Sequence, residues 1–442
     1  PIESKLSADR RAALTMNNGN YYALPHYEAF SGVVYDKDLF DSEKLYYADD
    51  RSYGDFILTA NAKKSKGPDG VYGTEDDGFP ATMVEFFALC DYMDEKGIVP
   101  FIWSGEQRAY TTFLLNALSA TWAGADEAKL NYSFGVGAEE GKDIAKVVES
   151  ISADGNTVVS VDTKITERNG YNMFHTEAKY RAMQFLFKIF NNEKYYYSDS
   201  MWSATATNRV AQETFIFSSL ENRPIAMLID GSWWEIESAD STRLAIQAYG
   251  KRAENRNYGW LPLPGYYDYS DMGYELVGNE AYDYDSYKRA TETTVIGKRQ
   301  VFTDYIDSYC AINALTKRPE LSKLFVKYCY SDKGLLDFTK STGMRKGVEY
   351  TVTDEVLNSV SSFSRNLLKL RAEGDIIFTM SMSNVFINNE AKLSSHEYIW
   401  NSSDYVYPID AFKNNKKSAV DYFNNMAISE SSWLASYGAF IK

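Results

Sequence analysis

Cysteine and histidine are scarce in this sequence, and their spacing excludes two common kinds of site. The chain contains three cysteines, Cys90, Cys310 and Cys329, none of which belongs to a CxxC pair. This dispersed, odd set is neither a zinc ribbon nor a dense disulfide framework, and we interpret the thiols as free and buried. The three histidines are widely separated and HExxH is absent, which argues against a histidine-rich metal site.

Long hydrophobic runs and nucleotide-binding motifs are also missing. No stretch approaches the roughly 18 apolar residues of a membrane-spanning helix. There is no P-loop, no GxGxxG with an acidic partner, and no Ser, His and Asp in the order of a hydrolase triad. The chain begins at Pro1 without an apolar leader or a lipid-accepting cysteine. We therefore expect a processed or truncated product from which any export signal has been lost.

Acidic residues outnumber basic ones, 61 against 46, so the net charge is −15. Such a chain repels phosphate backbones, and nucleic acid is excluded as a general partner. A length of 442 residues suits about three ordinary domains or two large lobes. The aromatic content is high, with 35 Tyr, 24 Phe and 8 Trp. Because tyrosine joins an apolar face to a polar tip, this composition favours surfaces that bind ligands.

Short strands alternate with helices along the chain, which predicts an α/β protein with mainly parallel sheets. The helix signals include a Thr82/Glu85 capping box, and Pro319 suits the first position of a later helix. We expect helices over residues 82–97, 107–122, 176–190, 208–220, 319–343 and 353–370, and strands over 98–103, 155–168, 223–229 and 309–315. Residues 21–35 should be extended. The segment 265–300 is rich in Tyr, Asp and Gly, and its length predicts a functional excursion.

Four segments carry a family resemblance. They are Tyr21-Tyr-Ala-Leu-Pro-His-Tyr-Glu28 with Val33-Val-Tyr-Asp-Lys-Asp-Leu-Phe40, Ile98-Val-Pro-Phe-Ile-Trp-Ser-Gly105, Ala226-Met-Leu-Ile-Asp-Gly-Ser-Trp-Trp234, and Cys310-Ala-Ile-Asn-Ala with Ser331-Asp-Lys-Gly-Leu-Leu-Asp-Phe338. In order and spacing they resemble family 1 of the extracellular solute-binding proteins. These are the carbohydrate receptors of ABC importers, the class that includes maltose-binding protein. The resemblance covers residues 21–343.

The resemblance implies a periplasmic-binding-protein-like fold of type II, with two α/β lobes joined at a hinge. Residues 1–28 and 300–345 would form what is present of lobe one, and residues 29–299 and 346–442 would form lobe two. In the family, much more of lobe one precedes the first crossing strand than the short stretch before Tyr21. We therefore expect the N-terminal part of lobe one to be missing from this chain.

The resemblance also implies the residues that contact a sugar. Trp233 should stack on a pyranose ring, and Trp234 should pack inward, because neighbouring residues in extended chain point to opposite sides. Trp103, Glu106 and Tyr110 are further candidate contacts, although a tryptophan at a strand end equally suits the core. Glu28 aligns with an acidic contact on the crossing strand, where a carboxylate can accept two hydroxyl hydrogen bonds. Its alternative is a solvated surface residue, and Tyr27 is a weaker candidate.

A glycine- and aspartate-rich loop at residues 67–78 suggests a separate hypothesis. Asp69, Glu75, Asp76 and Asp77 supply hard oxygen ligands, and the glycines permit tight turns. The spacing is not that of an EF-hand. The loop could hold a structural Ca²⁺, and the alternative is a turn without an ion.

The function implied by the resemblance is capture of an oligosaccharide and its delivery, by hinge closure, to the permease of an ABC importer. We expect a monomer with no catalytic residue and no required cofactor, located outside the cell as a surface lipoprotein or in the periplasm. A carbohydrate-active hydrolase and a surface lectin without an importer are the alternatives. Composition does not decide between a sugar and a peptide as the ligand.

Overall fold

The computed structural model describes residues 2–16, 18–49, 56–58, 61–221, 223–265, 300–304, 308–379, 404–405, 407–414, 417–439 and 441. The predicted functional excursion at 265–300 lies outside the described residues, apart from its two end positions.

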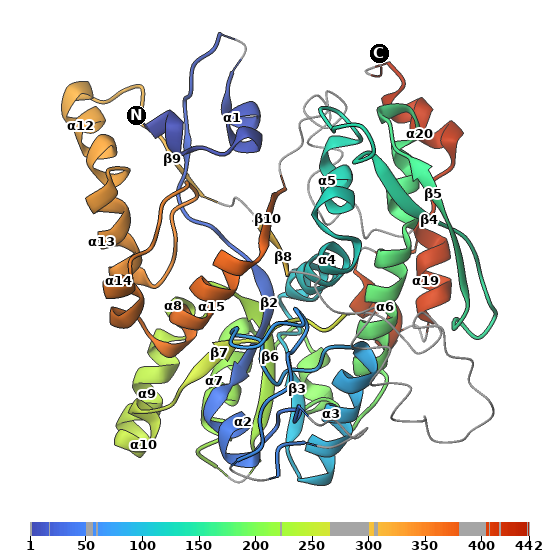
Figure 1. The fold of residues 1–442 in the computed structure, drawn as a ribbon, viewed down its shortest axis with the longest axis vertical. Coiled ribbons are helices and arrows are strands. Elements are labelled where there is room, and N and C mark those ends of the chain that lie inside the picture. The colour runs from blue at the N-terminus through green and yellow to red at the C-terminus, as the bar shows by residue number, and fades with distance from the viewer. Residues whose placement is uncertain are drawn as a thin grey trace.

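A four-stranded sheet forms the centre of the larger part of the molecule (Figure 1). Its order is β3 (Val99–Ile102), β6 (Ile225–Gly231), β2 (Ser31–Asp36) and β7 (Tyr258–Trp260). Strands β3 and β6 are parallel, but β2 is antiparallel to both of its neighbours. The prediction of mainly parallel sheets is therefore wrong for this sheet. Every residue of β2 and β6 is buried, and strands that are buried on both faces do not reveal their direction in sequence.

Helices cover this sheet, and those expected over 82–97, 107–122, 176–190 and 208–220 are present among them. They are α2 (Lys37–Glu43), α3 (Met83–Glu95), α4 (Arg108–Ala123), α6 (Glu177–Phe190), α7 (Asn208–Ser218), α8 (Trp234–Glu237), α9 (Ala239–Tyr249) and α10 (Lys251–Glu254). The Thr82 hydroxyl accepts a hydrogen bond from the Glu85 N–H at 3.2 Å, as the capping box predicts. The main apolar core lies between these helices and the sheet.

A second group of elements extends beyond α4 at the upper right of Figure 1. It contains α5 (Ala125–Ser133), the hairpin β4 (Ile144–Ile151) and β5 (Val158–Lys164), and the 3₁₀ helix η2 (Glu167–His175). The C-terminal helices α18 (Pro408–Asn414), α19 (Ala419–Met426) and α20 (Glu430–Tyr437) complete it. A second 3₁₀ helix, η3 (Asp199–Trp202), packs instead on the main core, where Trp202 contacts Trp103. Trp433 is fully buried at the centre of a small separate core, where it contacts Phe134 and Phe174.

The N-terminal segment and residues 308–342 form a smaller unit at the upper left of Figure 1. It comprises η1 (Ile2–Lys5), α1 (Ala8–Leu14), β1 (Leu24–Pro25), β9 (Tyr309–Cys310), α12 (Pro319–Cys329) and α13 (Asp332–Thr342). The strand predicted over 309–315 is wrong in length, because only two residues pair with β1. Helix α13 ends at Gly343, whose left-handed backbone (φ +71°) suits glycine, as predicted.

The helix predicted over 353–370 consists of two helices, α14 (Asp354–Ser359) and α15 (Ser362–Glu373). Val360 is extended between them, and the Ser361 hydroxyl caps α15 by accepting from the Ser364 N–H at 3.0 Å. Two further strands, β8 (Val301–Asp304) and β10 (Asp375–Phe378), pair in parallel above the main sheet (Figure 1). The assignment of 1–28 and 300–345 to one lobe, and of 29–299 and 346–442 to the other, stays a prediction.

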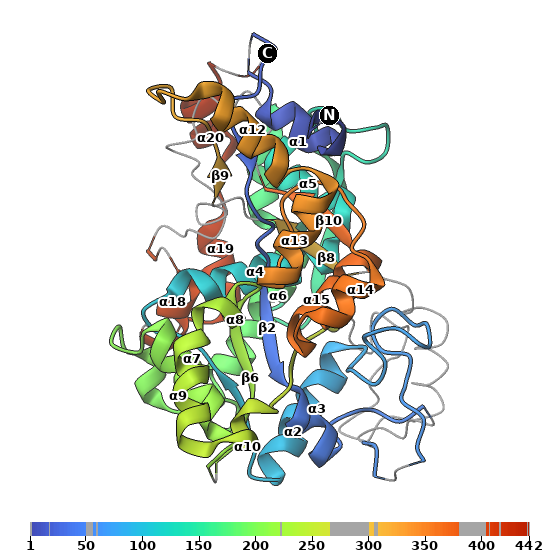
Figure 2. The ribbon, with the colours of Figure 1, turned by 90° about the vertical axis from the view of Figure 1, so that its left-hand side faces the viewer.

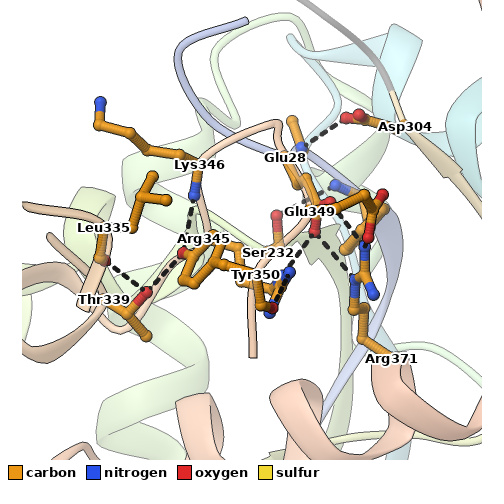
Figure 3. A network of polar contacts seen from close by, with 12 residues as sticks. Glu28, Ser232, Asp304, Leu335, Thr339, Arg345, Lys346, Glu349, Tyr350 and Arg371 are labelled. Carbon is orange, nitrogen blue, oxygen red and sulfur yellow. Dashed lines mark hydrogen bonds and ion pairs between the residues drawn. The ribbon is translucent and has the colours of Figure 1, made fainter. Parts of the chain in front are cut away.

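A buried cluster of charges joins these parts where the chain passes from β1 to β2 (Figure 3). Glu28 is 2% exposed and accepts two hydrogen bonds from Arg371 of α15, at 2.8 and 3.1 Å. Arg10 of α1 and Arg345, just after α13, each lie 3.4 Å from the same carboxylate. Arg10 also pairs with Asp304 at the end of β8. Four distant chain segments therefore meet at one carboxylate.

Burial and ion pairing act in opposite directions on the pKa values of this cluster. Burial opposes ionisation of Glu28, but Arg371, Arg345 and Arg10 outweigh burial and lower its pKa below the usual value. For Asp304 burial dominates, and its pKa rises to about 6 despite the attraction of Arg10. A buried arginine that loses its carboxylate partner carries an uncompensated charge, and that is costly.

We predict that Glu28→Gln destabilises the protein by about 3–5 kcal/mol, because the substitution keeps the shape but leaves the arginines without their central anion. Urea unfolding of both proteins would measure the difference. Glu139→Gln is the matched control, since its side chain is 78% exposed and pairs with Lys142 at the surface. It should change stability by less than about 0.5 kcal/mol. Equal stability of the two variants would contradict the structural role of Glu28.

Candidate functional site

The candidate site lies at one edge of the central sheet, where β3 and β6 end and β2 begins. The register places Ser31 opposite Gly231, so the segments after Gly231 and before Ser31 emerge side by side. Because β3 and β6 are parallel, the loop after Ile102 reaches the same edge. In open α/β sheets, ligands bind outside the carboxyl ends of the parallel strands. The aromatic residues predicted to contact a ligand lie in or directly after these loops.

Two predicted residues, Trp233 and Tyr110, meet at this edge. Trp233 follows β6 at the start of α8, and Tyr110 lies in the first turn of α4. The Trp233 indole N–H donates to Tyr110 Oη at 3.1 Å, and the two rings meet edge to face at 5.6 Å. Both side chains are half-buried. The Trp233 ring lies over Gly231, where an added Cβ would come within 2.3 Å of the ring. The pair is thus held in place while part of each ring faces solvent.

Acidic and amide side chains surround this aromatic pair. Glu237 lies 3.4 Å from Tyr110 Oη and accepts hydrogen bonds from Gln212 Nε2 at 2.9 Å and Asn208 Nδ2 at 3.3 Å. The same Gln212 amide donates to Asp230 at 3.0 Å. The amide nitrogens of Asn208 and Gln212 are therefore both engaged by carboxylates. Glu237 is exposed, whereas Asp230 is 2% exposed.

Burial sets the proton affinities in this cluster. The pKa of Asp230 rises to about 7, mainly because burial disfavours the charged form, and Glu237 adds repulsion. Burial also raises the pKa of Tyr110, with Asp230 and Glu237 contributing. Tyr110 therefore keeps its hydroxyl proton at physiological pH. The site offers aromatic faces together with carboxylate and phenol groups, a combination that suits a hydroxyl-rich ligand.

The structure corrects the prediction that Trp103 contacts the ligand. Its side chain is 0% exposed and packs among Phe190, Tyr196 and Trp202, with ring centroids 4.6–5.3 Å away. The core alternative therefore describes this residue. Trp234 is also buried and contacts Tyr258 and Phe363, as its expected inward packing requires.

Glu28 is likewise not available as a sugar contact in this structure, and it is not a solvated surface residue either. Its carboxylate oxygens contact the arginines of the cluster. The adjoining cavity beside Ser232 and Arg371 measures about 20 Å³, which is room for about one water. Tyr27 is half-buried and makes an edge contact with His26 at 5.6 Å. Glu106 is exposed in the loop between β3 and α4. Ligand contact by Tyr27 and Glu106 stays a prediction.

The acidic loop uses its carboxylates to stabilise its own turns. Asp69 accepts from the Val71 N–H at 2.7 Å, Asp76 from the Asp69 N–H at 2.8 Å, and Asp77 from the Gly73 N–H at 2.8 Å. Glu75 pairs with Lys369 at 2.6 Å. Among the described residues, no group of three acidic, His or Cys side chains is placed to hold a metal ion. The geometry thus gives the calcium hypothesis no support, and calcium binding stays a prediction.

Sequence reasoning missed Glu237, Gln212 and Asn208. Glu237 lies four residues after Trp233, which puts the two on one face of a short helix, and this spacing could have revealed it. Gln212 and Asn208 are four residues apart on α7, but nothing local indicates that this face meets α8. Their role depends on tertiary packing.

The adjacent tryptophans provide a matched test of this assignment. Trp234→Ala should destabilise the protein by about 3–5 kcal/mol, because it empties a buried site. Trp233→Ala should cost about 1 kcal/mol or less, because its ring is only partly buried. Chemical unfolding of both variants would measure this. A Trp233 variant as unstable as the Trp234 variant would show that both residues are core.

The raised pKa of Asp230 predicts a pH dependence of stability. Between its ordinary value of 3.8 and the folded value of about 7, the unfolded chain ionises while the folded chain keeps the proton. Stability should therefore fall as pH rises through this window, by an amount on the order of 4 kcal/mol from this group.

Asp230→Asn cannot ionise and should flatten this fall, as urea unfolding between pH 4 and pH 8 would show. Asp240→Asn, at an exposed position, is the control and should keep the wild-type slope. An unchanged slope in Asp230→Asn would mean that Asp230 is ionised throughout. The buried groups Asp76 and Asp304, with pKa values of about 7 and 6, add to the slope in all three proteins.

The chain is similar to several solved structures. A chitin oligosaccharide binding protein aligns with a TM-score of 0.51 at 12% identity, over 98% of this chain and 75% of that one. The solute-binding protein RafE in complex with raffinose gives a TM-score of 0.48 at 14% identity, covering 96% and 79%. A sugar transporter from Bacillus licheniformis in complex with stachyose gives 0.48 at 11% identity, covering 96% and 77%. No curated protein matches the chain in sequence.

Family comparison confirms the resemblance seen in the sequence. No described helix has the length and apolar character to cross a membrane. The family described as bacterial extracellular solute-binding protein matches residues 2–335. The chain belongs to this family of bacterial extracellular solute-binding proteins.

Proposed function

We propose that this protein is a receptor for neutral oligosaccharides that delivers its ligand to an ABC importer. The observation that carries the proposal is the Trp233–Tyr110 pair beside Glu237 at the carboxyl edge of β3 and β6. The fold is shared with a protein named for binding chitin oligosaccharides, which supports a saccharide as the ligand class. It would act as a monomer outside the cytoplasmic membrane, as a lipoprotein or in the periplasm.

The chemistry of the site favours a neutral sugar. A pyranose presents a face of C–H bonds that an aromatic ring can cover, while its hydroxyls donate to carboxylates. The amides of Gln212 and Asn208 are occupied by Glu237 and Asp230, so acceptors prevail around the aromatic pair. A sugar that carries its own carboxylate or phosphate would be repelled by Glu237.

Ligand delivery would use closure of the lobes about the crossing segment. The Glu28 cluster lies where this segment passes from the smaller unit to β2, so the pivot is held by buried ion pairs rather than by loose chain. A ligand that touches both lobes stabilises the closed form by its differential affinity for the two states. The closed form would then dock on the permease.

The geometry disfavours hydrolysis as the function. A glycosidase needs two carboxyl groups that flank the scissile bond. Asp230 has the raised pKa of a general acid, but it is buried and hydrogen-bonded to Gln212 and the Gly231 N–H. It therefore has no exposed oxygen from which a proton could pass to a leaving group.

A lectin without an importer would bind sugar without lobe closure, and a peptide receptor would prefer peptides.

Titration calorimetry against neutral oligosaccharides, their anionic counterparts and short peptides would test the proposal. We expect a neutral oligosaccharide to bind and to be recovered intact. Trp233→Ala and Tyr110→Ala should each weaken binding about 10- to 100-fold, which corresponds to roughly 1.4–2.7 kcal/mol. Tyr72→Ala, a partly exposed tyrosine on the acidic loop, is the control and should bind normally.

Three outcomes would contradict the proposal. Binding of peptides alone would change the ligand class, and hydrolysed sugar would indicate an enzyme. Unchanged affinity in both Trp233 and Tyr110 variants would move the site elsewhere. Small-angle scattering with and without ligand would separate the receptor, which compacts, from a lectin, which does not.

A further inference from the structure

Helix α8, which begins directly after Trp233, is held at two points. Its first residue, Trp234, anchors it in the core, where the side chain is 2% exposed. The next residue, Glu235, accepts hydrogen bonds on Oε2 from the hydroxyls of Ser361 at 2.7 Å and Ser364 at 2.8 Å. Because α8 has only four residues, a single anchor would leave it free to rotate. The second contact therefore fixes its orientation.

Glu235 meets α15 at the end that attracts a carboxylate. Ser361 is the N-cap of this 12-residue helix, and its hydroxyl accepts from the Ser364 N–H at 3.0 Å while it donates to Glu235. A negative charge near a helix N-terminus is favoured by the helix dipole. Ser364 is 4% exposed and Glu235 is half-buried, so the contact between α8 and α15 is well shielded from water.

The same serine lies against the point where the chain leaves the smaller unit. Helix α13 ends at Gly343, and a Cβ added there would clash with Ser364 Oγ and lie 3.8 Å from Glu235 Oε2. Figures 1 and 2 both show α13 above α8 and α15. The end of α13, the first turn of α15 and helix α8 therefore meet at Ser364.

Helix α15 continues this contact to the ion cluster. Arg371 lies seven residues after Ser364, which places the two on one face of the helix. Between them, Leu367 and Leu368 line the small cavity beside Glu28. Arg371 itself donates to Glu28 at 2.8 Å. One helix thus touches α8 near its first turn and the Glu28 cluster near its last.

We propose that Glu235 is a positioning residue for ligand binding, which couples the pivot at Gly343 to Trp233. Through Ser361 and Ser364 it holds α8 against the end of α13. A turn of the smaller unit at this point then shifts α8, and the indole ring moves with it. The inference rests on the proposed function for the role of the indole, and Glu235 acts without touching the ligand.

Hydroxyl-radical footprinting with mass spectrometry, on the protein without ligand, tests the position of Trp233. In Glu235→Ala, oxidation of Trp233 should rise by about twofold, because α8 loses its second contact. Glu235→Gln is the conservative variant and should restore the wild-type level, since an amide oxygen accepts from both hydroxyls. Titration calorimetry with a neutral oligosaccharide should give the same order, with affinity about 3- to 30-fold weaker in Glu235→Ala.

Glu177→Ala is the matched control for the loss of a carboxylate. Glu177 also accepts from a serine hydroxyl, that of Ser160 at 2.5 Å, and it pairs with Arg181. This contact joins α6 to β5 and does not involve α8. The control should lower the melting temperature but leave Trp233 oxidation and sugar affinity unchanged. A purely structural role of Glu235 would give the same result for both variants.

A pair of glycine variants tests the pivot. Gly343 and Gly97 both follow a helix and have left-handed backbones, with φ of +71° and +73°, so alanine should cost similar backbone strain at each. Only at Gly343 would the new methyl group meet Ser364, because nothing lies within 4 Å of a Cβ at Gly97. We expect Trp233 oxidation to change in Gly343→Ala alone.

Unchanged Trp233 oxidation in Glu235→Ala, or an equal change in Glu177→Ala, would overturn the proposal. Equal effects of the two glycine variants on Trp233 would overturn it as well. Footprinting needs no ligand, so the two proposals fail separately. A shifted Trp233 in a protein that binds no sugar rejects the proposed function alone. Equal sugar affinity and equal Trp233 oxidation in wild type and Glu235→Ala reject this inference alone.

Discussion

The ion cluster around Glu28 is the constraint on which the arrangement of the molecule depends. Its carboxylate is buried and accepts two hydrogen bonds from Arg371. Arg10 and Arg345 lie close to the same carboxylate. Each of these arginines comes from a different segment of the chain. If the Glu28 carboxylate is removed, no neighbouring change in sequence can replace it for all three arginines. A buried pair is weak evidence for added stability, but breaking one is costly. We infer that the cluster fixes how the smaller unit sits on the larger one.

The same crossing segment is linked directly to the candidate site. Phe30, two residues after Glu28, donates its N–H to Ser232 Oγ at 3.0 Å, and Ser232 returns its N–H to the Phe30 carbonyl at 2.7 Å. Ser232 precedes Trp233. A rotation about the crossing segment would therefore act on the backbone that carries the tryptophan, which gives a physical route from lobe movement to the binding surface.

Local signals predicted most of the elements, because caps and glycine or proline positions act within a few residues. Thr82, Pro319 and Gly343 set helix ends where the sequence indicates them. The sequence could not predict the burial of Trp103 and Glu28. The motifs predict both residues as ligand contacts. Trp103 is buried by Phe190, 87 positions away, and Glu28 by Arg371 of α15. Such pairings leave no periodic signal.

The distribution of donors and acceptors links the composition to the proposed ligand. With a net charge of −15, the protein repels anions at long range. The Glu237 carboxylate adds a local repulsion of anions at the site. Gln212 shares one amide between Glu237 and Asp230, while burial keeps Asp230 protonated up to a pH of about 7. The charge at the surface is then mainly that of Glu237. A ligand that donates many hydroxyl hydrogens and carries no charge matches this surface, whereas an acidic sugar would meet both the local and the global repulsion.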